Sequence, residues 1–220
     1  MQAAPAAERV RLRRKPDRGS YDFDVAARIL DEGIVCHVGF IRQGEPCVLP
    51  CNYARVDRHL YLHGSPASAL FLALAAGASV CVSVTLLDGI VLGRSGGGHS
   101  LQYRSVVVFG RSEEVKDPDE KRRALAGIVD QIVPGRSAEV RMPDAAELGH
   151  TCVVRVPIVE FSAKINEGAV NDPPEDVALP AWAGVIPYGL RAGAPVPDPA
   201  LPSEAVCPDA IAHYDRRPKG

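Results

Sequence analysis

Two serine hydroxyls stand at the junction between a short apolar strand and a helix. The segment LYLHGSPAS leads from the strand at residues 59–63 through Gly64 and Ser65 to Ser68. Serine is a favoured helix N-cap, and Pro66 suits the first helical turn. Backbone N–H groups, hydroxyls and the positive end of a helix dipole would therefore converge at one point. This pattern indicates either an ordinary capped helix start or a site for a phosphate or another small anion.

A glycine-rich loop and the strand after it form a second candidate site. The segment VLGRSGGGHSLQYRSVVVFG covers residues 91–110. Three consecutive glycines allow a ligand to approach the backbone closely. Arg104 stands near the start of the apolar strand between Tyr103 and Ser105, where a guanidinium suits a phosphate or carboxylate. The alternative is a surface hairpin with an exposed arginine.

The chain has no pattern typical of an activated nucleophile or a metal site. A G-x-S-x-G elbow, a phosphate-binding Walker loop and the dinucleotide fingerprint G-x-G-x-x-G are all absent from the sequence. Cys47 and Cys51 are four apart with no second pair at zinc spacing. The acidic pairs at 31–32 and 113–114 fall at element ends, which favours solvated positions. A site that binds without acid–base groups usually lets a cofactor supply the chemistry.

Composition narrows the class of protein. The 220 residues carry a formal net charge of −2, which gives no overall signal for nucleic-acid binding. No signal peptide precedes the first charged residues, and several of the six cysteines lie in apolar strands, so we expect reduced, buried thiols in a cytoplasmic protein. The longest apolar stretch, 67–87, is broken by Gly77 and predicts a helix followed by a strand, with no membrane span.

The order of expected elements predicts a mainly β fold with peripheral helices. Apolar periodicity and turn signals indicate helices at 22–32, 65–76 and 117–132, and strands at 34–41, 47–54, 59–63, 79–92, 102–115 and 151–165. Because no strand–helix–strand unit repeats, an antiparallel barrel with edge helices is favoured over a doubly wound parallel sheet.

Both ends of the chain differ from the barrel domain expected at residues 20–169. Residues 1–19 include six basic residues, and either form an arm for an anionic ligand or nucleic acid, or a flexible, solvated leader. Residues 170–220 hold ten of the nineteen prolines. Such a tail is expected to lie extended over the barrel or over a neighbouring subunit. Its tryptophan, Trp182, either anchors the tail or covers a cofactor.

Six segments together resemble one family. The segments ILDEGIVCHVGF, GEPCVLPCNYAR, LYLHGSPAS, VTLLDGIVLGRS, HSLQYRSVVVFG and LPAWAGVIP occur in this order between Tyr21 and Pro187. They resemble the pyridoxamine 5'-phosphate oxidase-like flavoproteins, in particular the branch with nitroimidazole-resistance reductases. The resemblance implies a split β-barrel of the FMN-binding type. It also implies a homodimer with FMN at the subunit interface.

The resemblance also implies roles for particular residues. The strand along the isoalloxazine ring would comprise Leu49, Pro50, Cys51 and Asn52. The phosphate turn would comprise His63, Gly64, Ser65 and Ser68. The residues approaching from the barrel or from the partner subunit would be His99, Ser100, Tyr103, Arg104 and Ser105. Trp182 would close over the ring system.

Departures from the family pattern suggest a weaker phosphate anchor and a roomier pocket. Relatives usually place Arg or Lys directly after the phosphate-turn serine, where this chain has Ala69. Losing such a charge-assisted contact costs about 1.5–3 kcal/mol. Gly97 and Gly98 replace bulkier residues. One hypothesis is therefore a site adapted to haem, with His37, His63 or His99 as the axial ligand.

The sequence therefore predicts an FMN-dependent oxidoreductase acting on a small molecule. It would pass electrons from a reduced nicotinamide to a nitro or quinone acceptor. The alternatives are a haem-dependent enzyme or haem-binding protein on the same fold, and a non-catalytic binding or accessory module.

Overall fold

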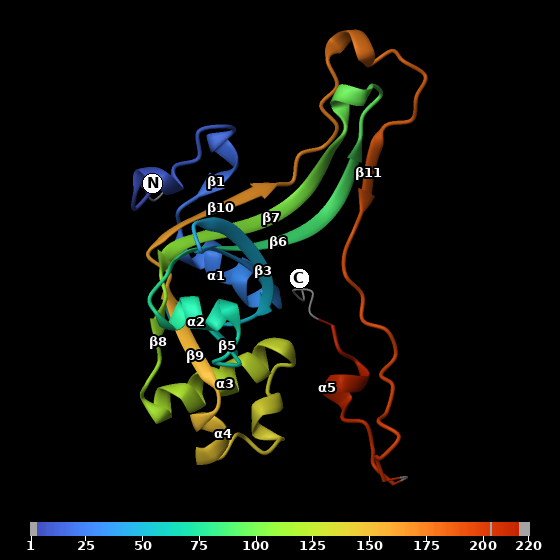
Figure 1. The fold of residues 1–220 in the computed structure, drawn as a ribbon. Coiled ribbons are helices and arrows are strands. Elements are labelled where there is room, and N and C mark those ends of the chain that lie inside the picture. The colour runs from blue at the N-terminus through green and yellow to red at the C-terminus, as the bar shows by residue number, and fades with distance from the viewer. Residues whose placement is uncertain (1–3, 203, 216–220) are drawn as a thin grey trace.

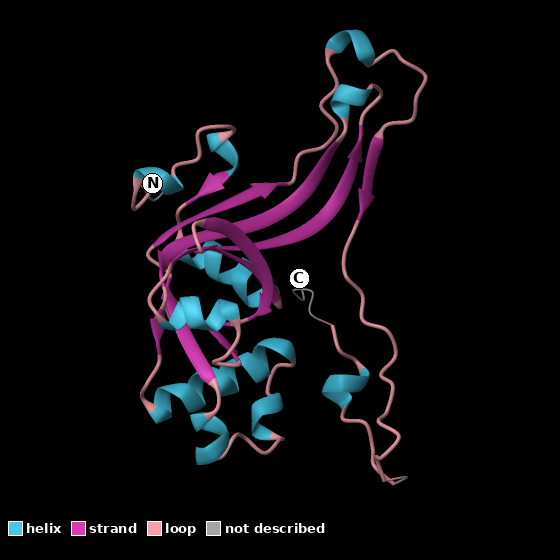
Figure 2. Cartoon of the chain, in the orientation of Figure 1, coloured by secondary structure: helices cyan, strands magenta, loops and turns pink. Residues whose placement is uncertain are grey.

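Two antiparallel sheets form the centre of the computed structural model, which describes residues 4–202 and 204–215 (Figures 1 and 2). The larger sheet has the order β1-β10-β7-β6-β2-β3, with β11 paired to β6, and the smaller has the order β4-β5-β9-β8. The strands are β1 (Gly19–Ser20), β2 (Val35–Arg42), β3 (Glu45–Asn52), β4 (Ala54–Val56), β5 (His59–Gly64), β6 (Ser79–Leu92), β7 (Ser100–Arg111), β8 (Glu113–Glu114), β9 (Cys152–Pro157), β10 (Glu160–Asn166) and β11 (Gly184–Pro187). The helices are α1 (Phe23–Glu32), α2 (Ala69–Ala75), α3 (Pro118–Ile132), α4 (Ala145–Gly149) and α5 (Asp209–Ala212).

The main core lies between the two sheets. Alternate residues of the long strands β6 and β7 face inward, as the period of two in a strand requires. These buried residues are Val80, Val82, Val84, Val106 and Val108. They meet Leu60 and Leu62 of β5 and the apolar face of α1, which includes Ile29 and Leu30. The expected mainly β split barrel with edge helices is confirmed.

A second, smaller core joins α3 to the smaller sheet. Leu125 and Ile128 of α3 pack with Tyr61 of β5 and Val153 of β9. The helix begins at a proline, and the Asp117 side chain accepts the Glu120 N–H as its N-cap, as the sequence predicts. This packing fixes α3 beside the end of β5.

Several elements differ from the sequence predictions. The strands expected at 47–54 and 102–115 are each divided between the two sheets, because β3 and β7 lie in the larger sheet and β4 and β8 in the smaller. The prediction of a single strand at 151–165 is wrong. This segment forms two strands, β9 in the smaller sheet and β10 in the larger, and the chain crosses between the sheets at residues 158–159. The helix expected from Ser65 begins at Ala69, since Ser68 is the N-cap that accepts the Phe71 N–H. Ser65 instead starts a turn in which its carbonyl accepts the Ser68 N–H.

Both chain ends contact the barrel. In the leader, Val10 is buried and β1 pairs with β10, so the described residues 4–19 lie along the larger sheet. In the tail, β11 extends the sheet beside β6, and the Tyr214 hydroxyl donates to the Ile132 carbonyl at the end of α3. Residues 1–3, 203 and 216–220 of these two segments lie outside the described residues. Among the described helices, none has the length and apolar character needed to cross a membrane.

The C-terminal end of α1 is held by Gln131 of α3. Its side-chain nitrogen, Nε2, lies 2.9 Å from the Leu30 carbonyl oxygen, 3.2 Å from that of Asp31 and 2.6 Å from that of Gly33. The Tyr53 hydroxyl also donates to the Leu30 carbonyl. Terminal carbonyls of a helix need such partners when they are buried.

We expect Gln131→Met to lower the free energy of unfolding by about 1–3 kcal/mol, because buried carbonyls lose their donor while the side-chain volume is nearly kept. Gln102→Met is the matched control, since its exposed amide donates to the carbonyls of Glu167 and Gly168, which water can reach. Urea unfolding monitored by circular dichroism measures both. Equal, small effects in the two variants would contradict the role given to Gln131.

Candidate functional site

His63 lies at the end of β5, where the strand leaves the smaller sheet. Its side chain is half-buried, and the ring atom Nδ1 is fully buried with no hydrogen-bond partner. Desolvation by burial lowers the pKa of this imidazole, which favours the neutral ring. A buried ring nitrogen without a partner is rare in folded proteins, and because Nδ1 is covered by protein, a ligand could reach this ring only at its other nitrogen, Nε2.

A cavity of about 430 Å³ separates His63 from α3. Its apolar wall comes from α3 and from the loop after it, and consists of Leu125, Ile128, Val129, Ile132, Val140, Met142 and Pro143. Asn52, the last residue of β3, lines the same cavity. The structure therefore brings together Asn52 and His63, two residues of the predicted cofactor site. The other lining groups are Arg141 and Thr151.

The rest of the predicted isoalloxazine strand lies on an edge of the larger sheet. In β3, Leu49 and Pro50 are exposed and Cys51 is half-buried. Cys51 stands opposite Cys36 of β2, and burial raises the pKa of the Cys51 thiol. Proline is tolerated on an edge strand because it has no N–H to give to a further strand. This edge is open to a cofactor or a second chain.

The predicted phosphate turn is closely packed. A side chain at Gly64 would overlap the Phe71 ring, so glycine is required there. The Ser65 hydroxyl accepts the Ala67 N–H, and the Ser68 hydroxyl caps α2. Both hydroxyls therefore also serve the local turn, and Ala69 brings no positive charge to it.

A second group of predicted residues lies along β7 and the segment next to β11. His99 and Ser100 are exposed where β6 and β7 extend beyond the barrel (Figure 1), and the His99 ring lies 3.0 Å from the Ser95 carbonyl oxygen. Tyr103 and Ser105 are half-buried further down β7. Trp182, just before β11, is 68% exposed. Within the described chain these residues do not join His63 around either cavity.

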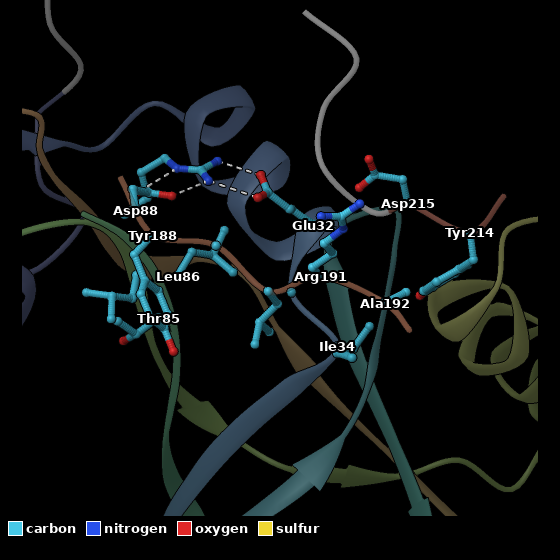
Figure 3. A pocket seen from close by; sticks show the side chains of 15 residues that line it. Glu32, Ile34, Thr85, Leu86, Asp88, Tyr188, Arg191, Ala192, Tyr214 and Asp215 are labelled. Atoms are coloured by element: carbon cyan, nitrogen blue, oxygen red, sulfur yellow. Dashed lines mark hydrogen bonds and ion pairs between the residues drawn. The ribbon is translucent and has the colours of Figure 1, made fainter. Parts of the chain in front are cut away.

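Arg104 is enclosed by two carboxylates of its own chain. Its guanidinium donates to Glu32 at 2.5 and 2.8 Å and to Asp88 at 2.7 and 3.0 Å. In Figure 3, dashed lines mark contacts to the labelled carboxylates of Glu32 and Asp88. These contacts, to Asp88 and then Glu32, raise the pKa of the arginine. Two negative charges around one positive charge leave this cluster anionic, which disfavours a phosphate ligand at Arg104.

A larger cavity, of about 620 Å³, adjoins this cluster. Its barrel side includes Ile34 and Leu86, and its outer side is formed by Tyr188–Ala192 and Tyr214 of the tail (Figure 3). Tyr188 is tied to the barrel because its N–H donates to the Asp88 carbonyl. The tail thus closes a mainly apolar space against the open end of the barrel.

A sequence model of the family described as pyridoxamine 5'-phosphate oxidase matches residues 22–165, which is more than half of the chain. The chain belongs to this family. Among curated proteins, none matches it. The matched region contains both sheets except β1, β11 and the last residue of β10, and it ends before the tail.

Solved structures of the family extend the likeness. The flavocytochrome Anf3 from Azotobacter vinelandii is 35% identical and covers 95% of this chain and 97% of its own, with a TM-score of 0.88. The FAD and haem binding protein from Mycobacterium smegmatis is 36% identical and covers 88% and 95%, with a TM-score of 0.84. A putative 5-nitroimidazole antibiotic resistance protein from Bacteroides thetaiotaomicron is 23% identical and covers 67% and 86%, with a TM-score of 0.57. The first two likenesses therefore extend beyond residues 22–165.

Two residues that form the charged cluster around Arg104 were not predicted from the sequence of this family member. Glu32, expected to be solvated at a helix end, has a side chain only 15% exposed against Arg104. Asp88 interrupts the apolar run LLDGIVL of β6, and an acid followed by glycine inside a strand is a signal for a bulge. The apolar wall on α3 was predicted only as a helix face. Among the described residues, no three His, Cys, Asp or Glu side chains group as a metal-ion site.

We expect Arg104→Met to lower the free energy of unfolding by about 1–3 kcal/mol, because it leaves Glu32 and Asp88 half-buried without their shared cation. Adding Glu32→Gln and Asp88→Asn to this variant should restore part of the loss. Arg122→Met, which breaks an exposed pair with Asp119, is the control and should change little. Urea unfolding at low salt measures all three. An Arg104 effect no larger than that of Arg122 would contradict a stabilising cluster.

Proposed function

We propose that this protein is an oxidoreductase that binds a flavin and a haem in one chain and passes electrons from a reduced nicotinamide to a small acceptor. The observation that carries the proposal is the match along almost the whole chain to two proteins named for both cofactors. The sequence resemblance implies that the flavin is FMN, whereas one of these relatives is named for FAD.

The cavity beside His63 suits a flat, largely apolar cofactor. Its volume of about 430 Å³ lies within the range of about 300–1,000 Å³ usual for small-molecule and cofactor sites. Its wall on α3 is aliphatic, and the half-buried His63 ring has a nitrogen without a partner. An imidazole in an apolar wall is one of the ligand arrangements that hold haem iron in proteins.

The protein's own residues would bind and orient the two cofactors and shield them from water. A bound flavin supplies two-electron exchange with nicotinamide, and a bound haem supplies one-electron exchange. Leu49 to Asn52 would present the edge of β3 to the flavin, while the aliphatic residues of α3 exclude water from the cavity. Asn52 lines that cavity at the end of the proposed flavin strand, so the two cofactors would be neighbours.

A homodimer is part of the proposal. The predicted flavin residues fall into a group on β3 and β5 and a group on β7 and the segment before β11, which the single chain keeps apart. The exposed Leu49 and Trp182 are apolar surfaces that a second copy would cover. Two symmetric sites would then each use one group from each subunit.

We expect protein purified from cells supplied with riboflavin and iron to show both flavin and haem absorption. Flavin and haem released by denaturation, identified by mass, should each approach one per chain. Size-exclusion chromatography with light scattering should report a dimer. Haem content that stays near zero, both as purified and after haem titration, would contradict the proposal; a flavin-only protein would support the FMN reductase predicted from the sequence instead.

A further inference from the structure

We infer that His63 is the axial ligand of the haem iron, in the cavity between β5 and α3. This assignment rests on the proposed function, because it presumes that the chain binds haem. The sequence left three histidines as candidates for the axial ligand, and this assignment selects one of them. It also places the haem against α3, outside the larger cavity under the tail.

The histidines differ in what their rings already contact. Of the six, all within the described residues, His63 combines a buried, unpartnered ring nitrogen with a place in a cavity wall. His37 is exposed on β2, and His99 is exposed with its ring against the Ser95 carbonyl. The rings of His150 and His213 lie against helix carbonyls. His59 packs against Tyr61 and lines neither cavity.

The accessible nitrogen of His63 is Nε2. Nδ1 is covered by protein, the ring lines the cavity, and the described structure gives the ring no hydrogen bond. If His63 served packing alone, burying its polar ring without a hydrogen bond would cost free energy.

The cavity contains one further soft donor and one cation. Met142, half-buried, lines it from the loop between α3 and α4, and a thioether is a known second haem ligand that raises the reduction potential. Arg141 lines the same cavity, and its guanidinium donates two hydrogen bonds to the Glu147 carboxylate.

The test is haem titration of the full-length protein and its variants, followed by absorption and electron paramagnetic resonance spectra. Haem is the probe. His63→Ala should lower haem affinity at least about tenfold and shift the Soret band, and added imidazole should restore the wild-type spectrum. His63→Cys should give a thiolate-type spectrum. The exposed His37→Ala and His150→Ala are matched controls and should bind and absorb like wild type.

The outcomes separate the two claims. A wild type that takes up no haem overturns the proposed function and this assignment together. A wild type that binds haem while His63→Ala and His63→Cys keep its spectrum and affinity overturns the assignment alone. Thermal unfolding of each apo variant checks that it is folded, and rescue by imidazole distinguishes a lost ligand from a collapsed cavity.

Discussion

The β-bulge at Asp88 is the constraint on which the arrangement of the open end of the barrel depends. β6 and β7 pair in register up to Leu87 opposite Tyr103 and resume at Gly89 opposite Gln102, so Asp88 is an extra residue in the ladder. A bulge re-aims its side chain and exposes backbone groups. Here the carboxylate binds Arg104 across the ladder, and the carbonyl accepts the N–H of Tyr188. One residue thus fixes both the charged cluster and the tail.

The two cavities follow from this arrangement and differ in character. The larger lies under the tail beside an anionic cluster, which disfavours a phosphate. The smaller lies between β5 and α3, has an aliphatic wall and contains the unpartnered ring of His63. Gln131 of α3 binds the carbonyls at the end of α1. This contact joins α1, which carries Glu32, to α3, which forms the wall of the smaller cavity.

Much of the barrel could be predicted because its strands alternate and its helices carry their own caps. Asp22 and Asp117 cap α1 and α3 at the first residues of the predicted helices 22–32 and 117–132, and β6 spans the predicted residues 79–92. The crossing after Pro157 was missed because alternation runs on through a change of sheet. The cavity wall was missed because a helix period shows an apolar face but not what it meets. His63 was recognised as a candidate from its motif; its lack of a partner is a tertiary property.

We propose that flavin and haem act in series within one protein. Anaerobic stopped-flow mixing of the loaded protein with a reduced nicotinamide, with the flavin band and the Soret band recorded together, is the sharpest measurement. If the cofactors act in series, the flavin is bleached first, the haem is reduced afterwards, and protein loaded with haem alone is not reduced. Haem reduction at the same rate without flavin, or a reduced flavin beside a haem that stays oxidised, would show that they do not.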